Sequence, residues 1–340
     1  MKQRLFVTLS LAGLAMATFG ATKPKTAIKS LNKTTIQQPT YTEWHDLQVN
    51  AINRFPLHTN FFTYPADDWV SEKDGKIVSK DILHMNKTES KYFLSLDGTW
   101  KFYWVANADQ RPTDFYKEDL DDSKWKTMNV PGNWEMNGFG DPEYVNNGFA
   151  WREHFNEQPP AVPTKDNHVG SYRRIIDIPA NWDGKQVVAH FGSVTSNIYL
   201  YVNGKFAGYA EDSKVAAEFD ITPYLKKGKN LIAFQTFRWC DGSWDEDQDF
   251  WRLSGVARES YLFARDAKLH LEDIRVTPDL VNNYKDGVLN ISTKVKGTGK
   301  LNFILFDKEG KQVATATGLA KNGTANITMN VENPHKWNAE

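Results

Sequence analysis

Residues 238–252 hold the densest group of side chains in this chain that could carry chemistry. Their sequence, RWCDGSWDEDQDFWR, contains five carboxylates and three tryptophans in fifteen residues. Carboxylates this close repel one another unless something neutralises them. The candidates are Arg238 and Arg252, a hard cation held by oxygen ligands, or sugar hydroxyls that donate hydrogen bonds. A solvated acidic turn fits the same composition, so the residues alone leave both interpretations open.

A second segment with possible binding residues is 130–148, VPGNWEMNGFGDPEYVNNG. Its proline, glycine and asparagine content predicts an ordered loop rather than a strand. Loops on β-sandwiches often carry binding groups. Turn formation alone would also explain this composition, so both interpretations again stay open.

The elements around these segments are predicted to be β-strands. Helical periodicity is scarce, whereas short alternating runs bounded by Gly, Asn, Asp or Pro recur. The dipeptide Asn203-Gly204 readily takes the positive φ angles of a type I′ turn, which predicts a hairpin. About eight strands between residues 90 and 264 predict an all-β jelly-roll sandwich. The clearest runs are 99–105, 171–178, 186–191, 197–202, 205–210 and 230–238.

Residues 265–340 have a different sequence pattern, in which the predicted strand segments are shorter and less aromatic and are separated by charged or glycine-containing turns. They predict a second, immunoglobulin-like sandwich. Such domains use roughly 100 residues, and no terminal strand precedes Glu340, so we expect this domain to be truncated.

The amino terminus resembles a targeting segment. Lys2 and Arg4 precede an apolar run that ends in the A-x-A pattern Ala15-Met16-Ala17, which predicts a signal peptide over residues 1–17. The run is too short to span a membrane. Residues 18–42 are rich in Lys, Thr and Gln and predict a flexible leader. We therefore expect export to the periplasm or the medium.

Composition limits the function classes. The chain is 40% hydrophobic and 24% charged, as globular proteins are, and its formal charge of −1 gives no reason to expect nucleic acid or an anionic membrane as a partner. Cys240 is the only cysteine, so an internal disulfide and a multi-cysteine metal site are excluded.

Several motifs carry a resemblance to a known family. They are LDGTWKFYW, VPGNWEMNGFGDPEYVNN, VGSYRRIIDIPANW, VNGKFAGYAEDSKVAAEFDIT and FRWCDGSWDEDQDFWRLSGVARE. In this order and spacing they resemble the sugar-binding jelly-roll domain of glycoside hydrolase family 2 β-galactosidases. The resemblance runs from about Glu43 to the last residue. VENPHKWNAE is similar to a stretch late in the immunoglobulin-like domain that follows in that family.

The resemblance implies substrate contacts at Asn146, Asn147 and Asp249. In the family, the loop with the asparagine reaches over the active site and contacts the galactosyl unit together with the next residue. That next residue is Asn147 here, where the family usually has valine. The resemblance also implies that Asp249 binds a sugar hydroxyl and a monovalent cation, Na⁺ or K⁺, completed by residues of the catalytic barrel.

The resemblance further implies a Mg²⁺ site. The matching positions are Glu43, Asp46, the carbonyl of Val49, Glu211 and Asp241. The side chains of Glu43, Asp46 and Glu211 differ from the best-known pattern, yet all still offer oxygen ligands to a hard cation.

The implied activity is hydrolysis of terminal β-D-galactosides, such as lactose or glycan galactose, with retention. Retaining glycosidases need two carboxyl groups about 5–5.5 Å apart. The family carries both on the barrel, so we expect no catalytic residue in this chain and no activity of the chain alone. Asn156-Glu157 superficially resembles an acid/base site, but it lies in a proline-rich loop and no barrel-strand pattern surrounds it.

Two alternatives remain open. The jelly roll could work alone as a carbohydrate-binding protein through Trp244, Trp251 and Asp249, although such a module should have a complete second domain. The chain could instead be an interface domain of an oligomeric enzyme, since the family's assembly habit is compatible with a homo-oligomer.

Overall fold

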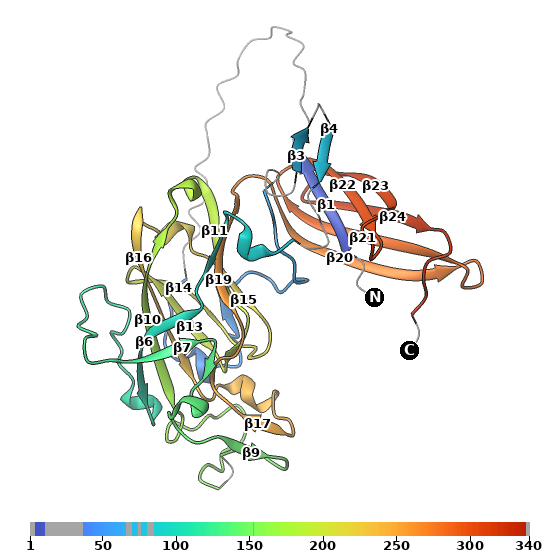
Figure 1. The fold of residues 1–340 in the computed structure, drawn as a ribbon. Coiled ribbons are helices and arrows are strands. Elements are labelled where there is room, and N and C mark those ends of the chain that lie inside the picture. The colour runs from blue at the N-terminus through green and yellow to red at the C-terminus, as the bar shows by residue number, and fades with distance from the viewer. Residues whose placement is uncertain are drawn as a thin grey trace, which may run out of the picture. The chain divides into compact units, whose positions relative to one another are not determined.

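The computed structural model describes residues 4–10, 37–65, 70–73, 76–79, 85–151 and 153–337. The prediction of an all-β protein is confirmed, because its elements are strands and single 3₁₀ turns (Figure 1). Within the described residues, no helix is long and apolar enough to cross a bilayer. The chain divides into two compact units. The larger contains residues 36–57 and 92–265, and the smaller contains residues 1–35, 58–91 and 266–340.

The larger unit is a jelly-roll sandwich. One sheet has the order β2-β14-β13-β16-β10-β6-β7, and the other has the order β15-β11-β19-β5. The strands of the first sheet are β2 (Ala51–Ile52), β14 (Lys205–Ala210), β13 (Ile198–Val202), β16 (Gly228–Phe237), β10 (Val169–Ile178), β6 (Gly98–Val105) and β7 (Lys126–Val130). Those of the second are β15 (Ala217–Asp220), β11 (Lys185–Phe191), β19 (Ser260–Asp266) and β5 (Phe93–Ser95).

Short strands and 3₁₀ turns are also among the described elements of the chain. In the larger unit the short strands are β8 (Gly132–Asn133), β9 (Glu143–Val145), β12 (Val194–Thr195), β17 (Phe250–Arg252) and β18 (Gly255–Val256), whereas β3 (Val70–Lys73) and β4 (Lys76–Ser79) belong to the smaller unit. The 3₁₀ turns are η1 (Glu43–His45), η3 (Lys87–Glu89), η4 (Ala108–Gln110), η5 (Glu135–Asn137), η6 (Ala180–Trp182), η7 (Thr222–Tyr224) and η8 (Asp241–Trp244).

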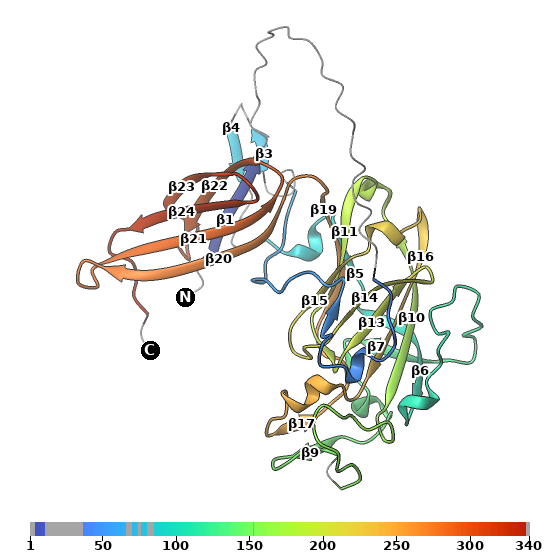
Figure 2. The same ribbon diagram turned by 180° about the vertical axis from the view of Figure 1, so that it is seen from behind.

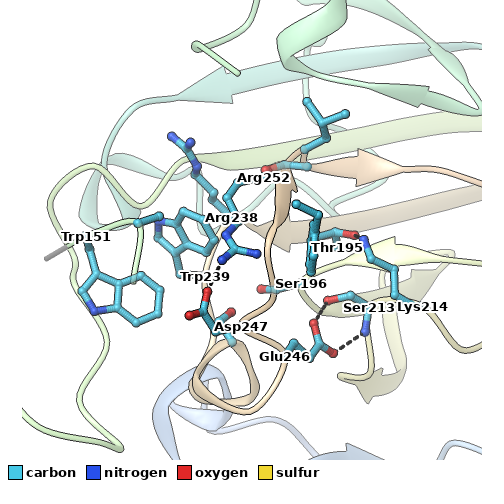
Figure 3. Close-up of a pocket in the computed structure, with 15 residues that line it drawn as sticks. Trp151, Thr195, Ser196, Ser213, Lys214, Arg238, Trp239, Glu246, Asp247 and Arg252 are labelled. Atoms are coloured by element: carbon cyan, nitrogen blue, oxygen red, sulfur yellow. Dashed lines mark hydrogen bonds and ion pairs between the residues drawn. The ribbon is translucent and has the colours of Figure 1, made fainter. Parts of the chain in front are cut away.

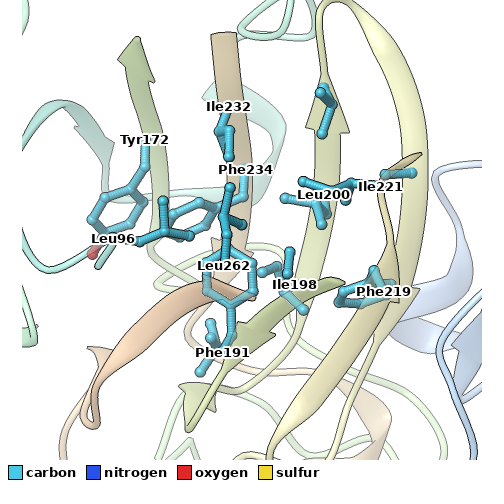
Figure 4. Close-up of a cluster of buried hydrophobic side chains, with 14 of the residues drawn as sticks. Leu96, Tyr172, Phe191, Ile198, Leu200, Phe219, Ile221, Ile232, Phe234 and Leu262 are labelled. Carbon is cyan, nitrogen blue, oxygen red and sulfur yellow. The ribbon is translucent and has the colours of Figure 1, made fainter. Parts of the chain in front are cut away.

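The main core lies between the two sheets of the larger unit. Tyr172 and Phe234 from the seven-stranded sheet meet Phe191, Phe219 and Leu262 from the four-stranded sheet, and all five are fully buried (Figure 4). Burial of a large apolar side chain contributes roughly 1.5–3 kcal/mol, so this layer is the main source of the unit's stability.

The seven-stranded sheet is buried on its second face as well. Tyr199, Tyr209 and Phe237 form a separate buried cluster there, covered by Trp44 of the entry segment, whose ring lies 5.1 Å from that of Phe237. All five residues of β13 are therefore buried. The sequence pattern could not show which distant segment would cover this face.

The predicted hairpin is confirmed. Asn203 and Gly204 take φ angles of 50° and 76° between β13 and β14, and Val202 pairs with Lys205. Both positive φ angles are those of a type I′ turn, whose twist matches that of the flanking strands.

The smaller unit is the predicted immunoglobulin-like sandwich. One sheet is β20 (His270–Val281), β21 (Asp286–Lys296) and β24 (Thr324–Val331), and the other is β1 (Arg4–Ser10), β22 (Gly299–Phe306) and β23 (Gln312–Ala320), as Figure 2 also shows. Ile291, Phe303 and Met329 are buried in its core.

Strand β1 falls within the predicted signal peptide. It pairs with β22 from Arg4↔Phe306 to Ser10↔Lys300. The other residues of the predicted signal peptide, and residues 18–36 of the predicted leader, lie outside the described residues. Signal-peptide function stays a prediction.

Deletion of residues 1–17 tests the β1–β22 pairing. Because an edge strand that loses its neighbour exposes a row of backbone N–H groups, we expect the β22 amides that donate toward β1 to exchange with deuterium faster. The amides of β21, which lies between β20 and β24, serve as the control. Unchanged exchange in β22 after deletion would contradict the pairing.

Candidate functional site

Two of the predicted site residues, Glu211 and Asp241, meet at one end of the strands of the seven-stranded sheet. Glu211 directly follows β14, and residues 238–241 directly follow β16. Because β14 and β16 each pair antiparallel with β13, their carboxyl ends lie at the same end of the sheet, next to the first residue of β13. The hydrogen-bond ladders therefore bring together residues that lie about 30 positions apart in sequence.

The two segments singled out from the sequence also meet. Strands β9 and β17 form a small antiparallel ribbon with the pairs Val145↔Phe250, Tyr144↔Trp251 and Glu143↔Arg252. In Figures 1 and 2 this ribbon lies at one end of the larger unit. Asn146 follows β9 and Asp249 precedes β17, so the register places these two residues opposite each other.

The ribbon presents the predicted sugar contacts to solvent. Asn146, Asn147 and Asp249 are exposed. The Oη atom of Tyr144 donates a hydrogen bond of 2.5 Å to Oδ1 of Asp249. The rings of Tyr144 and Trp251 are about half exposed and lie 5.6 Å apart. Exposed aromatic faces beside a carboxylate suit the C–H face and hydroxyls of a sugar ring.

Tyr144 was not among the predicted contacts. It lies two residues before Asn146, so the period of two along a strand puts both side chains on one face of the ribbon. Strand periodicity in DPEYVNN could have found it, but that segment was predicted to be a loop.

Most carboxylates of the acidic segment have identified partners. Arg252 pairs with Asp247, and Ser213 donates to Glu246 through both its backbone N–H and its hydroxyl group (Figure 3). Arg238 was one of the candidates for neutralising this segment, and its buried Nη2 donates instead to Oε2 of Glu143 at 2.6 Å. These contacts describe an ordered turn with specific partners rather than a freely solvated one.

A small cavity lies beneath the ribbon. It has a volume of about 30 Å³ and is lined by Trp151, Thr195, Arg238, Glu246, Phe250 and Arg252, among others (Figure 3). This space holds one or two water molecules.

A cluster of aromatic rings joins the loop after Asn147 to turn η8. Trp151 lies 5.0 Å from Trp244 and 5.2 Å from Trp239, and Phe149 lies 4.1 Å from Trp244, all three pairs edge to face. Trp244 also donates from Nε1 to the carbonyl of Ala161 at 2.9 Å. This aromatic cluster packs the two segments against each other.

Glu211 and Asp241, both predicted to bind Mg²⁺, lie together. Their carboxylate oxygens and Sγ of Cys240 all lie within 4.8 Å of one another, and all three residues are buried. Oδ1 of Asp241 accepts from the N–H of Gly242 at 3.0 Å, whereas Oδ2 is buried without a hydrogen-bond partner. An orphaned carboxylate oxygen beside a second carboxyl group fits a bound cation, so the residues present fit the implied metal.

Burial dominates the electrostatics of this cluster. Burial raises the pKa of Glu211 to about 8, against a lowering hydrogen bond of 2.5 Å from Tyr209 and with an added contribution from the neighbouring Asp241. Burial also raises the pKa of Asp241 and of the Cys240 thiol. Each charged form is disfavoured because the site removes water without supplying a matching charge.

The three remaining predicted ligands lie in the entry segment. The Glu43 carboxylate accepts from the N–H of Thr40 at 2.5 Å, from its hydroxyl at 2.8 Å and from Tyr199 at 3.0 Å. It is not part of the three-residue group. Asp46 accepts from the Gln48 N–H at 3.1 Å.

The entry segment nevertheless reaches the cluster through its backbone. The carbonyl of Asn50, next to Val49, accepts from the N–H of Glu211 at 3.0 Å. Cys240 was missed as a candidate ligand because a lone cysteine gives no motif by spacing. The position of Cys240 next to Asp241, itself a predicted ligand, was the sequence signal that could have identified it. Asn156 and Glu157, set aside as a false acid/base pair, are exposed and lie outside any strand.

Comparison with known families supports a common origin. Residues 93–266 match the family described as "Glycosyl hydrolases family 2, sugar binding domain", and residues 269–340 match "Glycosyl hydrolases family 2".

Similar curated proteins are β-galactosidases. The chain is 35% identical over 313 residues to that of Priestia megaterium, covering 88% of this chain and 29% of the relative. It is 36% identical over 299 residues to that of Halalkalibacterium halodurans, covering 87% of this chain and 28% of the relative. The β-galactosidase large subunit of Leuconostoc lactis is 32% identical over 308 residues, and the match covers 87% of this chain and 46% of that subunit. The chain thus spans less than a third of the length of the first two relatives.

Solved structures share the fold. A Bifidobacterium dentium β-glucuronidase has a TM-score of 0.56 at 18% identity, over 75% of this chain and 44% of that one. A glycosyl hydrolase family 2 member from Bacteroides cellulosilyticus has a TM-score of 0.52 at 23% identity, over 72% of this chain and 32% of that one.

The substitution Glu211→Gln tests the electrostatics of the cluster. The folded state holds a proton on Glu211 up to a pH of about 8, whereas the unfolded state releases it near 4.5. The free energy of unfolding should therefore fall as the pH rises between these values, by about 1.4 kcal/mol per pH unit. Glu211→Gln keeps an acceptor for Tyr209 and should remove this fall, stabilising the protein at pH 8.

The measurement is urea unfolding at pH 5 and pH 8 in the presence of a chelator. Glu157→Gln, at an exposed position, is the matched control and should leave the pH dependence unchanged. Identical pH dependence in the wild type and Glu211→Gln would show that Glu211 is ionised in the folded protein.

Proposed function

The chain belongs to glycoside hydrolase family 2, and from this premise we propose that it forms the sugar-binding part of a β-galactosidase. The complete enzyme would hydrolyse terminal non-reducing β-D-galactosides, such as lactose or glycan galactose, with retention. The observation that carries this proposal is the β9–β17 ribbon, which sets Asn146 opposite Asp249 on an exposed face. None of the described residues is proposed as an acid/base or a nucleophile.

The ribbon supplies complementary groups to a galactosyl unit. Asp249 uses Oδ1 to accept from Tyr144, which leaves Oδ2 to accept from a sugar hydroxyl. The Asn146 amide can both donate and accept, and Asn147 can contribute its backbone. The half-exposed ring of Trp251 offers an apolar face. These groups bind and orient the sugar, while the bond-breaking carboxyl groups come from elsewhere in the enzyme.

Two cations belong to this proposal. Na⁺ or K⁺ at Asp249 would neutralise its carboxylate and hold a sugar hydroxyl beside it. A divalent cation such as Mg²⁺ would lie at Glu211 and Asp241, where the orphaned Oδ2 supports it. Oxygens of Asp46 and Val49 would complete that site. Glu43 would support this cation site indirectly. Tyr199 donates a hydrogen bond to the Glu43 carboxylate, and the Tyr199 ring lies 4.5 Å from the ring of Tyr209.

Export and assembly are part of the same proposal. The amino-terminal targeting pattern supports transport to the periplasm or the medium. A homo-oligomer of the complete enzyme is the proposed assembly.

A stand-alone carbohydrate-binding protein is the second candidate. The exposed rings of Tyr144 and Trp251 favour it, since such a module needs only a sugar-binding surface. Trp244, predicted to contribute to such a module, instead packs edge to face against Phe149 and Trp151 in the aromatic cluster. An interface domain without a sugar contact would leave the exposed ribbon without a role.

We expect the isolated chain of residues 1–340 to hydrolyse no aryl β-galactoside. Sugar binding without the two catalytic carboxyl groups provides neither leaving-group protonation nor a nucleophile. The measurement is chromophore release at high protein concentration against a boiled control. Turnover clearly above that control would assign catalytic residues to this chain.

The substitution Asp249→Asn tests the sugar site in the full-length protein. It keeps the shape but removes the charge that accepts the hydroxyl and binds the cation. A hydrogen bond to a charged group contributes roughly 1.5–3 kcal/mol, so kcat/KM for a galactoside should fall by about ten- to a hundredfold. The response to Na⁺ should weaken with it, and the melting temperature should change little because Asp249 is exposed.

Asp245→Asn is the matched control, since Asp245 is an exposed carboxylate of the same turn. The measurement is kinetics at several Na⁺ concentrations, paired with thermal melting. Normal Na⁺-dependent kinetics together with a collapsed melting temperature would move Asp249 from the sugar site to the scaffold.

A further inference from the structure

We propose that Glu211, Cys240 and Asp241 form a mixed carboxylate–thiolate site that binds a thiophilic divalent cation such as Zn²⁺ in preference to Mg²⁺. This inference deepens the divalent-cation site and rests on the proposed function for that site alone.

The geometry allows one ion to contact all three side chains. Their ligand atoms lie within 4.8 Å of one another, and the residues are only 8%, 1% and 4% exposed. Ligand atoms around one tetrahedral zinc ion lie about 3.5 Å apart. Side-chain rotations that move these atoms by roughly 1 Å would close the group around an ion. The fourth position would then hold a water molecule or a backbone oxygen.

One feature of the cluster points to a missing ligand. Oδ2 of Asp241 is buried and has no hydrogen-bond partner. Sγ of Cys240 lies 3.8 Å from the carbonyl of Ser196 and 4.0 Å from Oγ of Ser243, and it also contacts the carboxyl group of Glu211. A bound cation would satisfy the Asp241 oxygen and would recruit the neighbouring sulfur as its thiolate.

The backbone holds the cluster in place. Turn η8 is closed by a reciprocal pair, in which the N–H of Cys240 donates to Oγ of Ser243 at 3.1 Å and the N–H of Ser243 donates to the carbonyl of Cys240 at 2.9 Å. Glu211 comes from the end of β14. An ion would therefore join β14 to the turn that leads to Asp249.

The sulfur atom decides which ion fits best. Mg²⁺ demands near-octahedral oxygen ligation and retains water, so a thiolate is a poor ligand for it. Zn²⁺ accepts sulfur and carboxylate oxygen in one tetrahedral shell. On binding, the thiol proton passes to solvent as the sulfur–metal bond forms.

The test uses the full chain, stripped with a chelator and titrated separately with Zn²⁺, Co²⁺, Cd²⁺ and Mg²⁺. Thiolate ligation produces a sulfur-to-metal charge-transfer absorption with Co²⁺ or Cd²⁺. Because Cys240 is the only cysteine, such a band can come from no other residue. We expect the band at one equivalent, and a Zn²⁺ affinity about tenfold or more above that for Mg²⁺ in chelator competition.

Cys240→Ser separates the thiolate from the carboxylates. It should abolish the band and weaken Zn²⁺ by about tenfold, while Mg²⁺ affinity stays within about threefold. Asp241→Asn should weaken every ion, and Asp245→Asn, outside the cluster, should change none. Thermal melting of each variant checks that it is folded, and if Cys240→Ser does not fold, the absorption of the wild type with Co²⁺ decides alone.

Absence of the band in the folded wild type, or unchanged Zn²⁺ affinity in folded Cys240→Ser, would overturn the proposal. Mg²⁺ binding without the band would keep the cation site and remove only the thiolate ligand. Neither result bears on the sugar contacts, which the Asp249 kinetics test separately.

Discussion

The register of the antiparallel ladders in the seven-stranded sheet is the constraint on which the rest of the larger unit depends. Strands β10 and β16 pair without interruption from Val169↔Phe237 to Ile178↔Gly228. A slip of one residue would turn Tyr172 and Phe234 out of the core, so burial locks the register. Once it is locked, the segment after β16 has one place to emerge, beside the end of β14. The site is thus a consequence of core packing.

The sequence predicted features that depend on local chemistry or on a long motif. The hairpin at Asn203-Gly204 follows from backbone preference, and both sandwiches follow from strand patterning together with the family motifs. The pairing of β9 with β17 was not predicted, because three-residue strands carry too little periodicity. Arg238 was a candidate partner for the carboxylates of its own segment, whereas its partner in the structure is Glu143 of β9. Such partners depend on tertiary structure that no local pattern encodes.

Two buried glutamates show how hydrogen bonding divides roles among similar residues. Glu43 and Glu211 each accept a hydrogen bond from one of two adjacent tyrosines, Tyr199 and Tyr209. Glu43 also receives two donors from Thr40, which compensate the loss of water around it. Glu211 instead has the Asp241 carboxyl group beside it. Glu43 therefore anchors the entry segment, whereas Glu211 belongs to a buried group of two carboxyl groups and a thiol.

The aromatic cluster beside the ribbon has an optical consequence. The rings of Trp151 and Trp244 lie 5.0 Å apart at 78°, and those of Trp151 and Trp239 lie 5.2 Å apart at 71°. Indoles held rigidly this close contribute to near-ultraviolet circular dichroism, which is lost when fixed packing is lost. The cluster therefore adds an intrinsic, label-free signal of ordered packing between turn η8 and the loop after Asn147.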